Sequence, residues 1–153
     1  MVLYHYDSYI IIFQPMKNRS DIEAIRVYEY MYKYLKACNC KSKFNIIDNK
    51  ASTDMKRYIT DANVNYQLFE PDNQQVNSYE RVIRTFKNNF VAGLSSVHPK
   101  LPMHLWDELL PQAFITLNLL QTSRTCPKIS AYSHIYGTYN FDTTTLAPPG
   151  VRS

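Results

Sequence analysis

Two acidic residues, Asp48 and Glu80, are the candidates for carboxylate chemistry in this sequence. Asp48 closes a short apolar run at residues 44–47 that is bounded by polar residues. Such a run is typical of a buried strand that delivers its last side chain to the edge of a sheet. Glu80 is predicted to lie on a helix, because apolar residues recur around it at spacings of three and four. These apolar residues are Val76, Tyr79, Ile83, Phe86 and Phe90.

The same helical periodicity places Arg84 and Lys87 on the face that carries Glu80. This arrangement has an ordinary explanation, since Glu80 and Arg84 are spaced as an i,i+4 ion pair that adds a few tenths of a kcal/mol to a solvated helix. Asp48 and Asn49 likewise suit a turn, because both side chains bond nearby backbone groups. Spacing alone therefore assigns neither acid a chemical role.

Three motifs of the sequence resemble the integrase core of long-terminal-repeat retrotransposons and retroviruses, within the RNase H-like polynucleotidyl transferase superfamily. Residues 46–49, Ile-Ile-Asp-Asn, resemble the family's strand that ends in Asp-Asn. Residues 74–81, Gln-Gln-Val-Asn-Ser-Tyr-Glu-Arg, resemble its lead into the helix that carries the Glu, and residues 105–113 resemble the helix that follows in retrotransposon integrases. The interval between the acids is somewhat shorter than in the retroviral motif, a difference that a loop can absorb. The similarity covers nearly the whole chain.

This resemblance implies an α/β fold, an RNase H-like layered domain in which helices flank a mixed sheet. Residues 1–140 would form this core, truncated and lacking its first strand, and residues 141–153 would form a Pro-containing linker or tail. Asp48 and Glu80 would be catalytic residues and ligands of Mg²⁺ or Mn²⁺, with the loop at residues 70–75 mobile above them. No other cofactor is implied.

The resemblance also implies a third acid, an Asp on a strand that precedes the first hairpin, and we expect this chain to lack it. Asp7 matches a family Asp in a turn, which is not a metal ligand, and its own pattern is that of a turn residue. An ion held by only two carboxylates is poorly fixed in place, and catalysis by positioned ions is sensitive to placement. We therefore expect little or no DNA strand transfer from this chain. Asp48 and Glu80 need not hold a metal ion in the chain as it stands.

The charge of the chain favours a nucleic-acid partner without requiring one. Seventeen Lys and Arg residues against 13 Asp and Glu residues give a net charge of +4 and a pI near 8.9. By resemblance, Arg84 and Lys87, together with Arg81, would contact the DNA backbone, which gives affinity with little sequence choice. Lys56 and Arg57 either extend this patch or lie on an ordinary solvated helix face.

Several other classes of protein find no support in the sequence. Three cysteines, Cys38, Cys40 and Cys126, and four scattered histidines do not match the paired ligands of a tetrahedral zinc site. The N-terminus lacks the pattern of a signal peptide, and no stretch reaches the apolar length of a membrane span. We expect a soluble intracellular protein with reduced thiols, nuclear by the resemblance, that uses neither a membrane nor a small-molecule substrate.

Local patterns predict the elements that position these residues. The expected elements are a hairpin of strands over residues 1–6 and 9–16, a helix over 20–37 that begins at a Ser20/Glu23 capping box, strands over 44–47 and 65–69, and helices over 52–61, 76–94, 103–121 and 130–136. Gly93 is expected to end the third helix and Pro111 to kink the fourth. The expected core face of the fourth helix is Trp106, Leu109, Leu110, Phe114, Leu117 and Leu120.

Three functional interpretations remain open. The first is an integrase core fragment of a polyprotein from a retrotransposon, a transposable element, associated with DNA integration through that element. The second is a non-enzymatic protein derived from such an element, which binds nucleic acid or forms a homodimer through the helix from Trp106 to Leu120. The third is a translated relic without function.

Overall fold

The computed structural model describes residues 1–40, 44–48, 51–68, 74–97, 102–144 and 146 of the 153 residues in the chain. Its elements, in order, are β1 (Val2–Tyr4), β2 (Ile11–Phe13), α1 (Asp21–Ala37), β3 (Phe44–Ile47), α2 (Thr53–Asp61), β4 (Asn65–Leu68), α3 (Gln74–Ser95), the 3₁₀ helix η1 (Met103–Leu109), α4 (Leu110–Leu120) and α5 (Ala131–Tyr136). Strands and helices alternate along the chain, so the predicted α/β class is confirmed.

The chain divides into two compact units, which share α3. The first unit consists of Met1 and Gln14–Glu80, and the second of Val2–Phe13 and Arg81–Ser153. The strands pair as two sheets, β1 with β2 antiparallel in the second unit and β3 with β4 parallel in the first. Both kinds of pairing found in a mixed sheet are therefore present, but within the described residues they occur in separate sheets.

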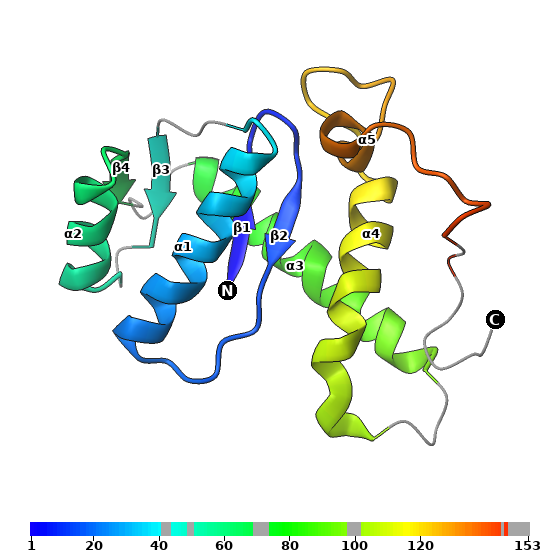
Figure 1. Cartoon of the computed structure of the whole chain (residues 1–153), viewed down its shortest axis with the longest axis horizontal. Coiled ribbons are helices and arrows are strands. Elements are labelled where there is room, and N and C mark those ends of the chain that lie inside the picture. The colour runs from blue at the N-terminus through cyan, green and yellow to red at the C-terminus, as the bar shows by residue number, and fades with distance from the viewer. Residues whose placement is uncertain (41–43, 49–50, 69–73, 98–101, 145, 147–153) are drawn as a thin grey trace. The chain divides into compact units, whose positions relative to one another are not determined.

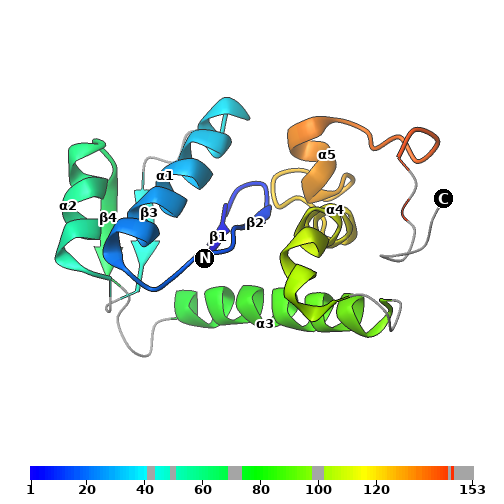
Figure 2. The same ribbon diagram turned by 60° about the horizontal axis from the view of Figure 1, so that its bottom comes forward.

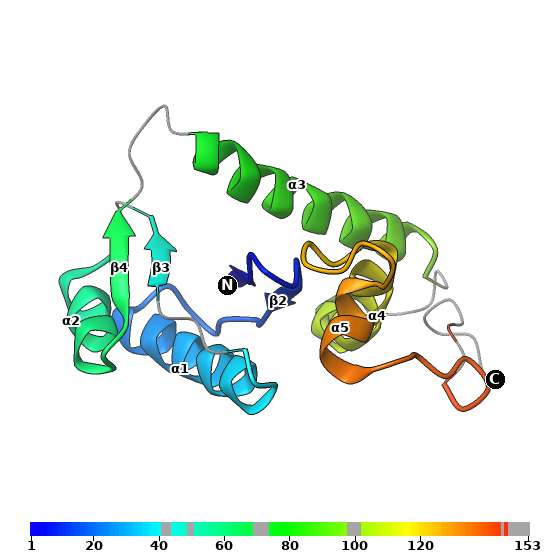
Figure 3. The same ribbon diagram turned by 90° about the horizontal axis from the view of Figure 1, so that it is seen from above.

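In the first unit, helices cover one face of the small parallel sheet. Figure 3 shows β3 and β4 side by side and pointing the same way, and α2 packs against both α1 and β4 (Figure 1). The buried core cluster is Tyr28, Met55, Ile59 and Val64. Ile47 and Tyr66 pack against this cluster, and Nδ2 of Asn45 donates to the Tyr28 hydroxyl. Ile46, which alternates to the opposite face, is 38% exposed.

Serine side chains cap the helices of this unit. The Ser20 hydroxyl accepts from the backbone N–H of Glu23 at 3.3 Å, as the predicted capping box requires. The second half of the box differs from the prediction, because the Glu23 carboxylate does not return to Ser20. It accepts instead from the backbone N–H of Lys17 at 3.0 Å and pairs with Arg26 at 2.7 Å. Glu23 thereby fastens the segment before α1 to the first turn of that helix.

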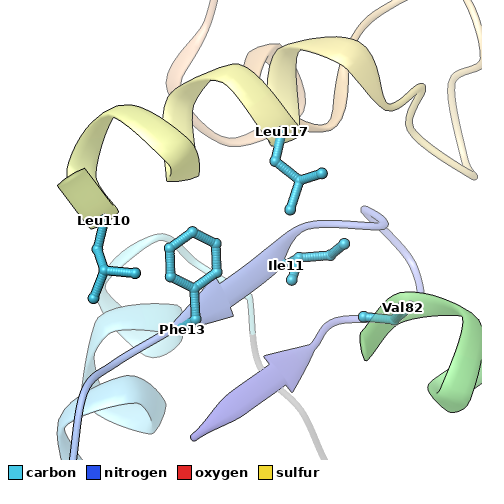
Figure 4. Close-up of a cluster of buried hydrophobic side chains, with 5 residues drawn as sticks. All are labelled: Ile11, Phe13, Val82, Leu110 and Leu117. Atoms are coloured by element: carbon cyan, nitrogen blue, oxygen red, sulfur yellow. The ribbon is translucent and has the colours of Figure 1, made fainter. Parts of the chain in front are cut away.

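The core of the second unit lies between the hairpin, α3 and α4 (Figure 4). Its buried members are Ile11, Phe13, Val82, Leu110 and Leu117. Phe86 and Phe90 pack against this cluster one and two turns beyond Val82, so these three residues form the buried stripe of this part of α3. The predicted stripe ran through Ile83, which is only partly buried. The sequence pattern thus identified the helix and the positions of Phe86 and Phe90, but it took Ile83 in place of Val82.

A buried amide on α4 fastens the hairpin. The backbone N–H of His5 donates to the C=O of Ile10 at 3.0 Å. Because alternate residues of an antiparallel pair direct their backbone groups away from the partner strand, those of Ile11 point outward. The N–H of Ile11 donates to Oδ1 of Asn118 at 2.8 Å, and Nδ2 of Asn118 donates to the C=O of Ile11 at 2.9 Å. Asn118 is 0% exposed, so α4 takes the place of a further strand at this edge of β2.

The single helix expected over residues 103–121 is two elements. The 3₁₀ helix η1 ends where α4 begins, and Pro111 lies in the first turn of α4. Proline suits this position because the first turn of a helix leaves its N–H groups unbonded. The predicted kink inside one long helix was therefore wrong, and Pro111 instead starts an α-helix. Figure 2 shows α5 beside α4, with which it is in contact.

The predicted core face of this region is only partly correct. Leu110 and Leu117 are buried, and Phe114 packs against their cluster. Trp106 and Leu120, at the two ends of the region, are 42% and 74% exposed. The interruption between η1 and α4 explains the exposure of Trp106, because residues on its two sides do not share one continuous helical stripe. Leu120 is the last residue of α4 and lies beyond the buried stripe of that helix.

Several predicted boundaries also move. Both hairpin strands are shorter than expected, and the residues between them include a turn at Tyr6–Ser8. Gln74 and Gln75, expected in a loop, begin α3, whereas Gly93 does not end this helix, which continues to Ser95. The rest of the expected loop, residues 70–73, and most of the predicted tail lie outside the described residues, and the predicted boundary near residue 140 stays a prediction. Across the described part of the chain, the helices are too short or too polar to cross a bilayer.

The two hydrogen bonds between Asn118 and the backbone of Ile11, which we call the Asn118 clamp, predict a large loss of stability when Asn118 is substituted. Asn118→Ala should lower the free energy of unfolding by about 2–6 kcal/mol, because it leaves two buried backbone groups of Ile11 unpaired at about 1–3 kcal/mol each. Chemical denaturation measures this difference. Asn88→Ala, at an exposed position of α3, is the control and should change stability by less than about 0.5 kcal/mol. Equal losses for both variants would show that the clamp does not stabilise the fold.

The Glu23 contacts predict a dependence of stability on acid pH. Hydrogen bonds from Arg26 and from the Lys17 backbone lower the pKa of Glu23 from its usual 4.5 to about 2. The ionised carboxylate therefore stabilises the fold above about pH 4.5, and this contribution is lost as the pH falls toward about 2. In denaturation experiments, Glu23→Gln should be less stable than the unmodified chain near neutral pH, and the two curves should converge at acid pH. Curves that stay parallel would contradict this account.

Candidate functional site

Asp48 lies where the sequence predicted it, directly after β3. Its side chain is exposed, and its backbone C=O accepts from the N–H of Ala51 at 2.9 Å. A bond between residues i and i+3 is typical of a turn. The turn interpretation of Asp48 is thus supported for its backbone, while its carboxylate remains accessible at the end of the strand. Asn49, its neighbour in the motif, lies outside the described residues.

Glu80 lies in the second turn of α3, and its side chain is exposed. Asp48 and Glu80 belong to the same unit of the chain. The i,i+4 pair predicted between Glu80 and Arg84 is not among the ion pairs formed by the described side chains, which join Arg26 to Glu23 and Lys33 to Glu29. The Glu80 carboxylate is therefore not neutralised by the cation one turn further along its helix.

The charge of Asp48, at the end of β3, acts on Tyr79 in the second turn of α3. The pKa of Tyr79 is raised, first by burial of the hydroxyl and then by the negative charge of Asp48. A carboxylate exerts such an effect only at short range through protein, so Asp48 lies near the residue that precedes Glu80. The sequence analysis counted Tyr79 among the apolar residues of the helix and missed this proximity. Its position next to Glu80 was the only signal that pointed to it.

The two acids fit part of a divalent metal site. Their oxygens are the hard ligands that Mg²⁺ prefers, and exposure leaves room for the waters that Mg²⁺ retains. Among the described residues, however, no group of three His, Cys, Asp or Glu side chains is placed to hold a metal ion. Two carboxylates leave most coordination positions to water, so these residues do not fit a centre that fixes two catalytic ions. No catalytic step is derived from them.

Three cations on α3 are exposed, namely Arg81, Arg84 and Lys87. Arg84 and Lys87 are three residues apart and so lie on one face of the helix. The positive charge of Arg81 also affects Tyr4, which lies in the hairpin. Burial and the neighbouring Tyr9 and Tyr6 raise the pKa of Tyr4, and the charges of Arg124 and Arg81 oppose that rise.

The remaining sequence candidates have structural positions. Asp7 lies in the hairpin turn, where its backbone C=O accepts from the N–H of Thr125 at 3.3 Å, in agreement with its expected turn role. On α2, Arg57 is exposed and Lys56 is partly buried. Both belong to the first unit, and their participation in a basic patch stays a prediction.

The sequence analysis also missed an aromatic and cationic cluster in the second unit. The Arg124 guanidinium lies 3.8 Å from the centroid of the Tyr6 ring, although the two residues are far apart in the chain. No local spacing signals such a contact, because it depends on the meeting of the hairpin turn with the loop between α4 and α5.

The proximity of Asp48 and Tyr79 is testable by titration. Asp48→Asn should lower the pKa of Tyr79 by removing a negative charge, while burial keeps that pKa above its usual 10.0. Nuclear magnetic resonance of ring-labelled tyrosine follows the change. Asp61→Asn, which removes an exposed acid at the end of α2, is the matched control. The same Tyr79 pKa in both variants would show that Asp48 does not lie beside it.

Comparison with known proteins supports the fold. No family model and no curated protein sequence matches the chain. Among solved structures, the chain is similar to the catalytic core domain of BIV integrase, with a TM-score of 0.63 and 13% identity over 88% of this chain and 82% of that one. It is also similar to a chain of the simian T-cell lymphotropic virus intasome in complex with PP2A regulatory subunit B56 gamma, with a TM-score of 0.65 and 19% identity over 95% of this chain and 49% of that one. This chain therefore spans about half of that intasome chain, and its fold is that of a retroviral integrase catalytic core, as the sequence motifs predicted.

Proposed function

We propose that this chain is an integrase-like, nucleic-acid-binding domain of retroelement origin that acts on DNA in the nucleus. The observation that carries the proposal is the row of exposed cations on α3, Arg81, Arg84 and Lys87, in a chain with the fold of an integrase core. In such a domain, α3 contacts the phosphate backbone of duplex DNA. Backbone contacts give affinity that depends on salt and little on sequence.

Asp48, directly after β3, and Glu80, in the second turn of α3, have a subordinate role in this proposal. Asp48 and Glu80 form a weak site for Mg²⁺ or Mn²⁺, in which water supplies the other ligands. A divalent cation there reduces repulsion between the carboxylates and a nearby phosphate. Strand transfer is not part of the proposal, because two carboxylates alone do not hold a pair of ions at the precision that phosphoryl transfer requires.

A dimer-forming role is the second candidate. It is favoured by the exposure of Trp106 and Leu120, which leaves 42% and 74% of these two apolar residues accessible in the isolated chain. Aromatic side chains such as that of Trp106 are enriched at protein interfaces. A homodimer would bury them, and it is compatible with DNA binding through α3.

DNA binding through α3 is tested by its salt dependence. For the unmodified chain, three phosphate contacts predict that log K falls with log salt with a slope of roughly −2.7. Arg84→Ala/Lys87→Ala should weaken duplex binding and reduce the size of this slope by about 1.8, because two contacts are lost. Fluorescence anisotropy with a labelled duplex at several salt concentrations measures both quantities.

Two control variants sharpen this experiment. Arg19→Ala/Lys36→Ala removes the same charge from exposed positions on α1 and on the segment before it and should leave the slope unchanged. Asp48→Asn should not weaken duplex binding, since it removes a negative charge and no phosphate contact. If both double variants lose affinity equally, the binding reflects net charge rather than the α3 surface, and the proposal is wrong.

A further inference from the structure

Aromatic and cationic side chains meet at the turn of the hairpin in the second unit, away from Asp48 and Glu80 in the sequence. The rings of Tyr4 and Tyr9 stack with their centroids 5.7 Å apart, and Tyr6 meets Tyr9 edge to face at 6.2 Å. The Arg124 guanidinium lies 3.8 Å from the centroid of the Tyr6 ring. We call Tyr4, Tyr6, Tyr9 and Arg124 the tyrosine platform.

The platform is accessible although its base is buried. Tyr6 is 55% exposed, and Arg124 is exposed as well. Beneath them, Ser8 is 0% exposed, and its hydroxyl accepts from the N–H of Ile10 at 3.3 Å and bonds Nδ1 of His5 at 2.8 Å. These bonds hold the turn from inside, so the exposure of the Tyr6 ring is not the result of a loosely tethered loop.

Tyr9 adopts a backbone conformation that bulky residues seldom take. Its φ is 59°, in the left-handed region where glycine and asparagine are much more common. A strained residue persists only where the surrounding structure holds it, and such residues cluster at binding sites. Here the strained residue is the ring on which both Tyr4 and Tyr6 pack. The unusual backbone thus serves to place an aromatic ring at the tip of the hairpin.

Two contacts fix Arg124 beside the turn. The N–H of Thr125, the next residue, donates to the C=O of Asp7 at 3.3 Å. On the other side, the buried hydroxyl of Ser123 bonds Nδ1 of His134 at 2.9 Å. Because both neighbours of Arg124 are anchored, its guanidinium is held over Tyr6 at little further cost in side-chain freedom.

The charges around the platform favour an anionic partner. Arg124 and Arg81 both act on the Tyr4 hydroxyl, where their positive charges oppose the rise in its pKa. Asp7 and His134 are the charged or titratable neighbours that act on His5 in the same turn. The exposed guanidinium of Arg124 places a positive charge beside the stacked rings, which provide flat apolar faces.

We propose that the tyrosine platform binds single-stranded nucleic acid, with a base stacked on the Tyr6–Arg124 pair and a phosphate against Arg124. Stacked aromatic rings beside guanidinium groups are the usual elements of surfaces that bind unpaired bases. An acidic peptide would use the charges but not the flat rings. The inference shares only its class of partner with the proposed duplex binding, since Tyr6 and Arg124 take no part in the contacts assigned to Arg84 and Lys87.

The test is binding of a labelled oligothymidylate of about 12 nucleotides, a length within the site sizes typical of single-strand surfaces. Tyr6→Ala should weaken binding by about tenfold, because base stacking on one ring is lost. Tyr6→Phe should retain most of the affinity, because it keeps the ring. Arg124→Lys should keep the salt dependence but lower the affinity, because it keeps the charge and loses the planar group. Fluorescence anisotropy with the full chain measures all four proteins.

Matched controls make the outcome decisive. Tyr30 on α1 is also 55% exposed, so Tyr30→Ala removes an equally accessible ring and should leave the affinity unchanged. An abasic strand of the same length should bind the unmodified chain more weakly and should be insensitive to Tyr6→Ala. Thermal unfolding of each variant identifies any loss of binding that comes from misfolding. If Tyr6→Ala misfolds, the affinity of Tyr6→Phe is compared with that of the unmodified chain instead.

Three results would overturn the inference. One is equal affinity of Tyr6→Ala and Tyr30→Ala for the oligothymidylate. Another is equal binding of the abasic strand, which would leave only a phosphate contact. The third is that polyglutamate binds as tightly as the oligothymidylate with the same sensitivity to Tyr6→Ala, which would make the surface a docking site for an acidic protein. Duplex binding by Arg84→Ala/Lys87→Ala is independent of these results, so failure of the platform and failure of the proposed function are distinguishable.

Discussion

The second unit depends on a hydrogen-bonding constraint at Ile11. The backbone N–H and C=O of this residue point away from β1 and are buried, so they need partners that β1 does not provide. Asn118 supplies both, and it does so from a helix whose Leu110 and Leu117 pack on the same strand. A two-stranded hairpin is marginally stable alone in water. The tyrosines at the hairpin turn are therefore presented by a contact that spans 107 positions of the sequence.

Features that depend on a few neighbouring residues were predictable from sequence. The bounds of α1, α2 and β3 agree closely with expectation, because serine caps and short apolar runs act locally. Features that depend on tertiary packing were not. Pro111 suits either a kink or a helix start, and only the break after η1 decides between them. Asn118 looked like any polar residue on a helix, since nothing in its spacing shows that it pairs with a strand.

The candidate site shows the same division. The strand end that carries Asp48 and the helix that carries Glu80 were both predicted, and their assignment as a pair came from motifs rather than from spacing. The proximity of Asp48 to Tyr79 could not be read from the sequence, because it depends on tertiary packing between the end of β3 and α3. The platform was missed altogether, since Tyr6 and Arg124 meet through two loops. Similarity to integrase cores at 13% and 19% identity extends to the fold alone. The role of each proposed functional residue therefore needs its own test.

The division of the chain into units has a consequence for the order of folding during synthesis. The first unit is nearly contiguous in sequence, whereas the second joins Val2–Phe13 to Arg81–Ser153. The hairpin residues therefore leave the ribosome before α4, which is translated about a hundred residues later. The entropy cost of closing a loop grows only slowly with the length of the loop. This separation therefore affects the rate of folding more than the final stability. The hairpin residues are thus made before α4 but reach their native partners only after it has been made.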